Sequence, residues 1–275
     1  HECGRGGHPA CLLRLERGTI ALMRRPTPRH VLALLTAVLL LGAALRLSAL
    51  RAVPPGLQHD EIFYAHDATT VLHGNLHLFF PENQGREPLF IYLLALSLSS
   101  LGQNALAIRL PAAFCGLLAL ALTYRWAGAA FGWRTAIYTI LFMAIGFWPL
   151  WLSRTGLRVT TLAPLAALAG WLLTRAAQRP SVKRFVLAGL ALGLCFYSYP
   201  AAYVLPLVVA GWLVALAFFA RKQAARLWPG VLLIPGVAAL CFVPLGLAIR
   251  ASSIGYARAG NVAGPLTAAL AGDTG

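Results

Sequence analysis

Residues 51–104 read RAVPPGLQHDEIFYAHDATTVLHGNLHLFFPENQGREPLFIYLLALSLSSLGQN, and they form the one long polar interval in an otherwise apolar chain. The interval holds five of the eight acidic residues: Asp60, Glu61, Asp67, Glu82 and Glu87. It also holds four of the seven histidines: His59, His66, His73 and His77. Because carboxylates and imidazoles do most acid–base work, we expect the chemistry of this protein to take place here.

The composition around this interval is typical of a multi-pass membrane protein. Of 275 residues, 59% are hydrophobic and 11% are charged, and the mean hydropathy is +0.72. The net charge of +15 does not indicate nucleic-acid binding, because the basic residues occur in short clusters between apolar runs. The five cysteines show neither a disulfide framework nor zinc-finger spacing.

Seven apolar runs are long enough to cross a bilayer, which takes about 20 residues. They are residues 31–50, 106–124, 135–152, 159–174, 185–200, 203–220 and 230–249. Basic clusters precede the first run and follow the second, fourth and sixth, so the positive-inside rule places these segments and the N-terminus in the cytoplasm. The interval 51–104 is then external. The expected fold is an all-α integral membrane protein with about seven transmembrane helices and a long first external loop carrying juxtamembrane helices.

The apolar segment 88–101 tests this topology, because a further span would reverse the sides. Its fourteen residues cover about 21 Å as a helix, less than the ~30 Å hydrocarbon core. We therefore place it as a juxtamembrane or re-entrant helix, with a true span as the alternative. The seven runs contain no Asp or Glu, which argues against an ion-coupled transporter. Arg46 and Arg109 are expected to reach the interface from the ends of their runs.

Residues 59–73 favour a helix that ends at Gly74 and Asn75. His59, His66 and His73 recur every seven residues, as do Asp60 and Asp67, so each set falls on nearly one face. Residues seven apart lie about 10.5 Å apart along a helix, too far to share one zinc ion. A solvated face is the simpler reading of His66, His73 and Asp67, while a metal held by Asp60 or Glu61 with ligands from elsewhere stays open.

Asp60 and Glu61 are the strongest candidates for catalysis. Two adjacent carboxylates at a membrane surface repel each other, and this repulsion can raise one pKa and produce a general base. The alternative is an interfacial acidic pair without a role.

The order of motifs resembles the polyprenyl-phosphate-sugar glycosyltransferases of the GT-C fold, which include protein mannosyltransferases (the glycosyltransferase family 39 type) and aminoarabinose–lipid A transferases. The resemblance runs from about Val31 to Arg258. It rests on the Asp60–Glu61 pair with Tyr64 and Ala65, the segment GREPLFIYLLALSLSSLG, the Arg109-Leu110-Pro111 entry to the next run and the seven runs.

This resemblance implies transfer of a sugar from a polyprenyl-phosphate carrier to an external acceptor. It implies that Asp60, with Glu61 beside it, is the catalytic base. Cations must hold the donor phosphate, and Arg154 and Arg158 are candidates, with lipid-headgroup contact as the alternative. The aminoarabinose transferases have a lysine before the proline where this chain has Glu87, so Arg86 or another base would replace it. No metal site is assigned, and the cofactor stays unknown, with a divalent metal left open.

The expected organisation is a partly disordered cytoplasmic arm (1–30), a GT-C-like transmembrane module (31–249) and a truncated external tail (250–275). The expected location is the plasma or inner cell membrane. The expected partners are a lipid-linked sugar donor, an acceptor protein, lipid or glycan, and membrane lipids, but no nucleic acid. A flippase or transporter for lipid-linked sugars and a non-catalytic membrane scaffold are the rival interpretations.

Overall fold

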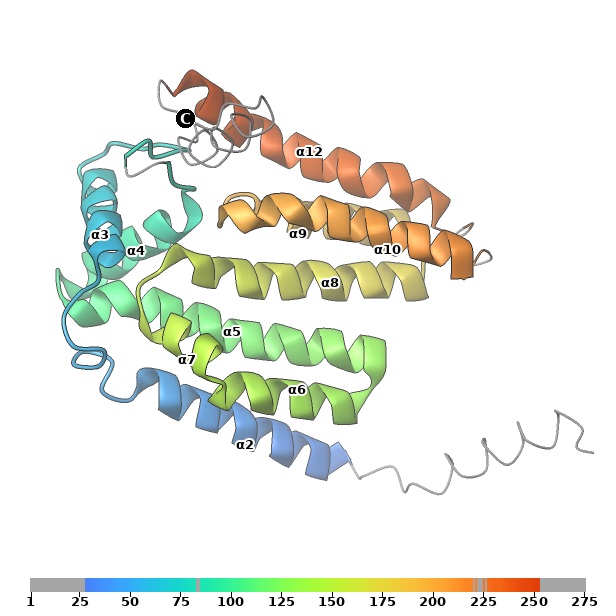
Figure 1. The fold of residues 1–275 in the computed structure, drawn as a ribbon, viewed down its shortest axis with the longest axis horizontal. Coiled ribbons are helices and arrows are strands. Elements are labelled where there is room, and N and C mark those ends of the chain that lie inside the picture. Colours follow the sequence, from blue (N-terminus) through green and yellow to red (C-terminus); the bar gives the residue numbers. More distant parts are fainter. Residues whose placement is uncertain (1–27, 83–84, 220, 222–224, 226, 253–275) are drawn as a thin grey trace, which may run out of the picture. The chain divides into compact units, whose positions relative to one another are not determined.

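The computed structural model describes residues 28–82, 85–219, 221, 225 and 227–252 as a set of helices (Figure 1). In order, these are α2 (Pro28–Leu47), α3 (His59–Leu72), α4 (Leu89–Leu101), α5 (Ala105–Phe131), α6 (Trp133–Ile145), α7 (Phe147–Arg154), η1 (Arg158–Thr161), α8 (Leu162–Gln178), α9 (Val182–Cys195), η2 (Pro200–Val204), α10 (Leu205–Phe219) and α12 (Trp228–Ala251). Within the described residues the extended pairing is limited to one isolated bridge, Phe80 to Arg86. The predicted all-α class is confirmed.

Two compact units divide the chain, His1–Ala37 and Val38–Gly275. In the first unit the described residues form the N-terminal half of α2, and the features discussed below belong to the second. Most of the predicted arm 1–30 and of the predicted tail 250–275 lies outside the described residues, so the predicted domain limits remain predictions.

Five helical segments among the described residues are long and apolar enough to cross a membrane: Arg29–Leu47, Ala105–Phe131, Arg158–Gln178, Pro200–Phe219 and Leu232–Ala251. The pair α6 and α7 makes a sixth candidate, bent by 57°. Helix α9 occupies the remaining predicted run, but its 14 residues span about 21 Å. The membrane class is therefore established, while the count of seven spans remains a prediction.

The break between α6 and α7 follows from the sequence GFWP at residues 146–149. A proline ring clashes with the carbonyl four residues earlier in a continuous helix, and for Pro149 that residue is Ile145, the last residue of α6. Gly146 takes an extended conformation at the break (φ −62°, ψ 139°). The break leaves carbonyl groups of α6 without partners inside the helix, and buried Arg46 donates to two of them, at Met143 (3.0 Å) and Ala144 (3.1 Å).

This contact corrects one prediction. Arg46 and Arg109 do not extend to an interface, because each is only 1% exposed. Arg46 also donates to Ser153 Oγ at 3.2 Å, and Arg109 pairs with Glu61. Snorkelling is the usual solution when a long cationic side chain has no partner at membrane depth. Here a broken helix and a buried carboxylate supply the partners.

Helices α5, α8, α9 and α12 run side by side (Figure 1). Glycines allow α9 and α12 to approach closely: a Cβ atom at Gly189 would lie 2.8 Å from the Ile234 carbonyl oxygen, and one at Gly193 would lie 2.5 Å from Cys241 Cβ. Small residues serve this purpose in membrane helices, where association depends on close packing rather than on the hydrophobic effect.

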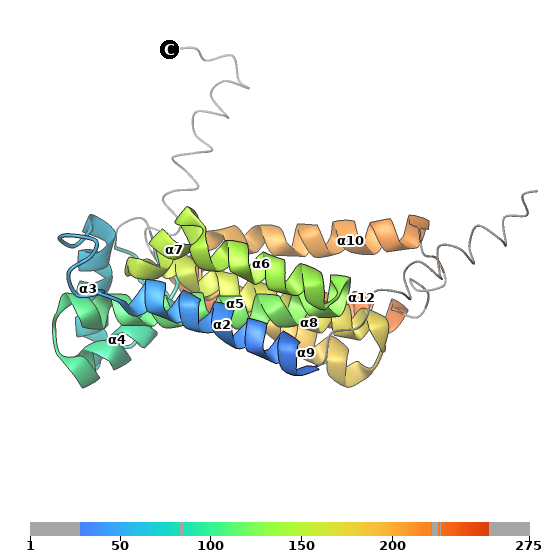
Figure 2. The same cartoon turned by 90° about the horizontal axis from the view of Figure 1, so that it is seen from below.

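Helices α3 and α4 are grouped at one end of these long helices (Figure 2). Their shared core contains Ala68, Phe90, Ile91 and Leu94. Both elements match the sequence predictions: α3 ends just before Gly74, whose φ of +91° suits glycine, and α4 is an apolar helix of 13 residues. The polar interval thus forms a small helical cap, and the connections after α5 and α8 lie at the opposite end (Figure 1).

We predict that Gly189→Ala destabilises the protein. The added methyl group forces α9 away from the Ile234 carbonyl, and overpacking of this kind typically costs about 1–3 kcal/mol. Gly211→Ala on α10 is the matched control, since nothing lies within 4 Å of its Cβ position. Thermal unfolding in detergent, followed by circular dichroism, should show a lower Tm for the first variant only. Equal Tm values would contradict the close contact.

Candidate active site

The acidic pair lies in the first turn of α3, where the positive end of the helix dipole favours carboxylates. Pro54, Pro55 and Gly56 precede this helix, and Gln58 is its N-cap. The backbone N–H of Gln58 donates to Glu61 Oε2 at 2.7 Å, which is one half of a capping box. The helix therefore begins where it does because Glu61 turns back on its own N-terminus.

Glu61 is fully buried and paired. Its Oε1 atom accepts hydrogen bonds from Arg109 Nε at 3.1 Å and from the Gly156 backbone N–H at 2.8 Å. Together with the bond from Gln58, the carboxylate accepts three bonds and exposes no surface. Such a carboxylate joins α3, α5 and the turn after α7.

Arg109 extends this hydrogen-bond network to the segment between α2 and α3. Its terminal nitrogens donate to the backbone carbonyls of Pro54 (2.8 Å), Leu50 (3.3 Å) and Gly56. The guanidinium group thus binds the segment that leads from α2 to α3, which otherwise has no regular structure to satisfy its carbonyls. The Glu61–Arg109 pair fixes the position of the α3 N-terminus, and with it the position of Asp60.

Asp60 differs from its neighbour because 41% of its side chain is exposed. Its carboxylate lies 3.8 Å from His59 Nδ1. It also lies close enough to Tyr64 for its charge to help raise the pKa of that phenol, for which burial is the larger cause. Of the two adjacent carboxylates, Asp60 is therefore the one that a substrate can reach.

The prediction of a solvated helix face is wrong for Asp67. His66 and His73 are exposed, but Asp67 is only 3% exposed, and its Oδ2 lies 2.9 Å from Arg86 Nε. Burial raises the pKa of Asp67 to about 6, although Arg86 acts in the opposite direction. Asp67 departs from the predicted face because Arg86, 19 positions along the chain, is folded back over α3.

Arg86 is itself buried, and burial lowers its pKa, an effect that Asp67 opposes. Its guanidinium carbon lies 5.7 Å from the ring centroids of both Phe63 and Tyr64. Neither terminal nitrogen of Arg86 makes a hydrogen bond to the described residues. A buried guanidinium with unused N–H groups is costly unless something else binds to it.

Arg158 forms the third buried pair, with Glu87. Its guanidinium carbon lies 6.0 Å from the Tyr64 ring centroid and 5.4 Å from that of Tyr199. The two rings and the carboxylate hold Arg158 in place, while its Nε lacks a hydrogen bond within the described part of the chain. Tyr64 thus contacts both Arg86 and Arg158.

Arg154 has a different environment. Its guanidinium donates to the backbone carbonyls of Leu45, Arg46, Ser48 and Val53 at distances of 2.5–3.3 Å. These carbonyls lie at and beyond the end of α2, where a helix leaves its last acceptors unpaired. Arg154 therefore caps α2, and its N–H groups are used for that purpose.

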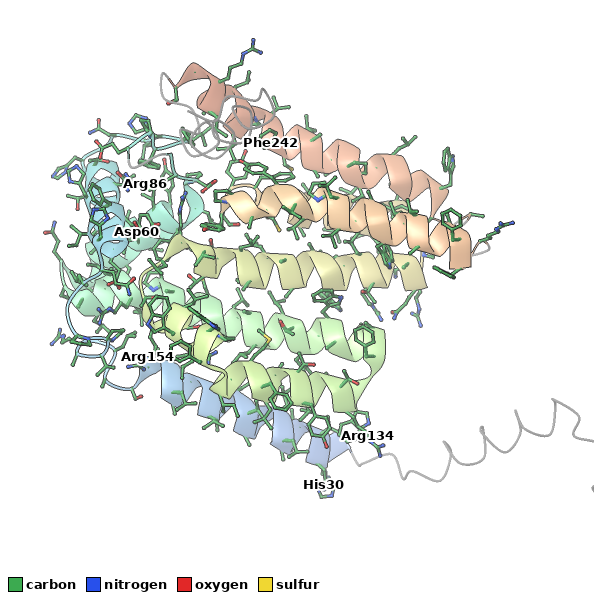
Figure 3. All side chains as sticks on the ribbon, viewed as in Figure 1. His30, Asp60, Arg86, Arg134, Arg154 and Phe242 are labelled. Carbon is green, nitrogen blue, oxygen red and sulfur yellow. The ribbon has the colours of Figure 1, made fainter. Side chains whose placement is uncertain are left out.

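Asp60, Arg86 and Arg158 lie together around Tyr64, whereas Arg154 is hydrogen-bonded to the end of α2. Asp60, Arg86 and Arg154 all lie at the α3 end of the bundle, and Arg134 lies at the opposite end (Figure 3). Among the described residues no group of three or more His, Cys, Asp or Glu side chains could hold a metal ion. The partners of Asp67 and Glu87 could not be predicted from the sequence, because both pairings depend on how the loop after α3 folds against distant parts of the chain.

Comparisons with known proteins agree with this arrangement. A family model described as dolichyl-phosphate-mannose-protein mannosyltransferase matches residues 85–256. The Archaeoglobus fulgidus oligosaccharyltransferase in its apo form superposes with a TM-score of 0.66 at 19% identity, covering 84% of this chain and 31% of that one. ArnT from Cupriavidus metallidurans, solved with undecaprenyl phosphate bound, gives 0.62 at 19% identity, covering 83% and 43%. No curated protein sequence matches the chain.

These findings first define the class: the chain has the fold of the GT-C glycosyltransferases, as its resemblance to them predicts. The chain belongs to the dolichyl-phosphate-mannose-protein mannosyltransferase family. It spans about a third of the length of the first solved structure and less than half of the second.

We predict that Glu61→Gln strongly destabilises the protein, because it leaves Arg109 buried without a counter-charge. Removing one partner of a buried pair typically costs about 3–5 kcal/mol. Asp60→Asn is the matched control, since the same chemical change one residue away affects a half-exposed group. Thermal unfolding of both variants in detergent measures the difference. A loss of Tm in Asp60→Asn as large as that in Glu61→Gln would contradict the assignment.

Proposed function

We propose that this protein transfers a sugar from a polyprenyl-phosphate carrier to an acceptor on the external face of the membrane, with Asp60 as the general base. The observation that carries the proposal is that the accessible Asp60 carboxylate lies near Tyr64, whose ring also contacts two buried guanidinium groups with unused N–H donors. Family membership supports the reaction class, and the undecaprenyl phosphate bound to ArnT supports the type of carrier.

The chemistry asks for two kinds of group. Asp60 takes the proton from the acceptor hydroxyl or amine while that atom forms a bond to the anomeric carbon. The bond from the anomeric carbon to the phosphate oxygen breaks, and the lipid phosphate leaves with the electron pair. Hydrogen-bond donors that are already in position stabilise the negative charge that develops on that oxygen. Arg86 and Arg158 supply these hydrogen-bond donors in our proposal, and both guanidinium groups contact the Tyr64 ring.

Glu61 and Arg154 receive supporting roles. Glu61 positions the α3 N-terminus, because its oxygens already accept three hydrogen bonds. Arg154 caps α2 instead of binding the donor phosphate. The basic connections after α5 and α8 lie opposite the α3 end, so the positive-inside rule favours an external α3, and the basic residues before α2 favour a cytoplasmic N-terminus. The proposal also includes a lipid-linked sugar donor and a location in the plasma or inner cell membrane.

We predict that Asp60→Asn lowers the rate of transfer by about 10²–10⁴-fold, the usual contribution of a general base. The assay uses membranes containing the full-length protein, a panel of radiolabelled polyprenyl-phosphate sugars and a measurement of labelled product. Asp60→Glu, which keeps the carboxylate, should retain part of the activity. Full activity in Asp60→Asn would exclude Asp60 as the base. Movement of the sugar across the membrane without product would instead favour a flippase.

We also predict that Arg86→Lys raises the KM for the donor about tenfold or more, because lysine cannot reproduce the planar array of guanidinium donors. Arg154→Lys is the control, and it should lower the Tm while leaving the donor KM unchanged, since its bonds run to backbone carbonyls. Kinetics at varied donor concentration, together with thermal unfolding, separate the two effects. The reverse pattern would move the phosphate site to Arg154.

A further inference from the structure

A polar cavity of about 580 Å³ lies beside the proposed active site, between α3, the segment after it and the end of α12. Its polar lining consists of Asp67, Thr70, Asn75, His77, Glu82 and Ser252. Three other cavities, between α4 and α5, between α9, α10 and α12, and around α8, are lined almost wholly by apolar side chains. Apolar cavities at membrane depth suit lipid chains, but this one does not.

Two polar atoms in the cavity lining have no hydrogen-bond partner among the described residues. One is Asp67 Oδ2, which faces Arg86 Nε but does not accept a well-aligned hydrogen bond from it. The other is the hydroxyl oxygen of Ser252. Both atoms are shielded from solvent within the protein. Unpaired buried groups of this kind require an explanation, such as a bound water molecule, an ion or a functional role.

We propose that this cavity is a sugar-binding subsite, which accepts one polyhydroxyl ring of the donor or of the acceptor; the inference rests on the proposed glycosyl transfer. Carboxylate and amide oxygens accept hydrogen bonds from sugar hydroxyls, and the cavity presents Asp67, Glu82 and Asn75 for this purpose. Leu78, Phe79 and Pro81 provide an apolar wall for the C–H face of the ring.

The cavity is not the position of the reacting sugar. Asp67 lies two turns after Asp60 on α3, about 10.5 Å along the helix axis. A ring bound at Asp67 is therefore displaced from the bond that Asp60 serves, so it belongs to a neighbouring sugar unit of a longer donor or acceptor. The cavity then contributes specificity for chain length and for the stereochemistry of that unit.

The test measures the binding of simple sugars without turnover. The full-length protein is placed in phosphatidylcholine nanodiscs, which carry no sugar headgroup. Saturation-transfer NMR then detects methyl α-glucopyranoside, methyl α-mannopyranoside and methyl α-galactopyranoside. At least one of them should bind, with a Kd in the millimolar range. Ala251→Trp should abolish this signal, because Ala251 lines the cavity at the end of α12 and the indole fills the space.

Two further variants make the result specific. Leu247→Trp, one turn earlier on α12 and 63% exposed, adds the same side chain outside the cavity lining and should bind as the unmodified protein does. Asn75→Ala removes one acceptor from a loop and should weaken binding about threefold to tenfold. The inference is overturned if none of the three glycosides binds, or if Ala251→Trp binds them as well as Leu247→Trp does.

Kinetics identify which substrate carries the ring. A raised KM of Ala251→Trp for the donor alone assigns the ring to the donor, and a raised KM for the acceptor alone assigns it to the acceptor. Unchanged values for both overturn the inference. Because the NMR test needs no turnover, glycoside binding that Ala251→Trp removes supports the cavity even in a protein that fails to transfer sugar, so the two proposals fail separately.

Discussion

Three buried ion pairs fix the helical cap: Glu61–Arg109 and Glu87–Arg158 hold it to the helical bundle, and Asp67–Arg86 joins two segments within it. Each charge on its own would be far too costly to bury, so the pairs form only when the cap and the bundle have both folded. The first pair connects α3 to α5, the second connects the segment before α4 to η1, and the third connects α3 to the loop that follows it. The geometry of the candidate site therefore depends on these pairs as well as on the hydrophobic contacts of the cap.

The ion pairs also divide the acidic residues of the polar interval into buried and exposed groups. Three of the five carboxylates in the polar interval are buried in the ion pairs, while Asp60 and Glu82 keep 41% and 61% of their side chains exposed. Asp60 sits one residue before a carboxylate that is fixed by three hydrogen bonds. The adjacent acids therefore differ in role: Glu61 sets the position of the backbone, and Asp60 is the carboxylate that, in our proposal, faces the substrate. An exposed carboxylate on a rigid turn is well placed for the base that we propose.

Periodicity and charge predicted the helices because both are local properties. The limits of α3, the shortness of α4 and the separation of basic from acidic connections all followed from spacing along the chain. The pairings did not follow, because Arg46, Arg109 and Arg86 find partners about 19 to 107 positions away. Sequence reasoning treated Arg46 and Arg109 as isolated cations at an interface, and Asp67 as a member of a solvated face. The seven-residue spacing of Asp60 and Asp67 did indicate a shared face, although not that Arg86 covers part of it.

The arginines of the cap differ in how fully their donors are used, and this difference separates support from function. Arg109 and Arg154 each make four hydrogen bonds, mostly to backbone carbonyls, so a ligand could bind them only at the expense of the fold. Arg86 is equally well buried but makes only ion pairs, with Asp67 at 2.9 Å and with the half-exposed Glu82 at 3.9 Å, and both its terminal nitrogens are without hydrogen bonds to the described residues. Folding alone gives no reason to bury donors in that state. A phosphate would accept hydrogen bonds from these nitrogens. Arg86, whose N–H groups are unused, is therefore a better candidate for contact with the donor phosphate than Arg109 or Arg154.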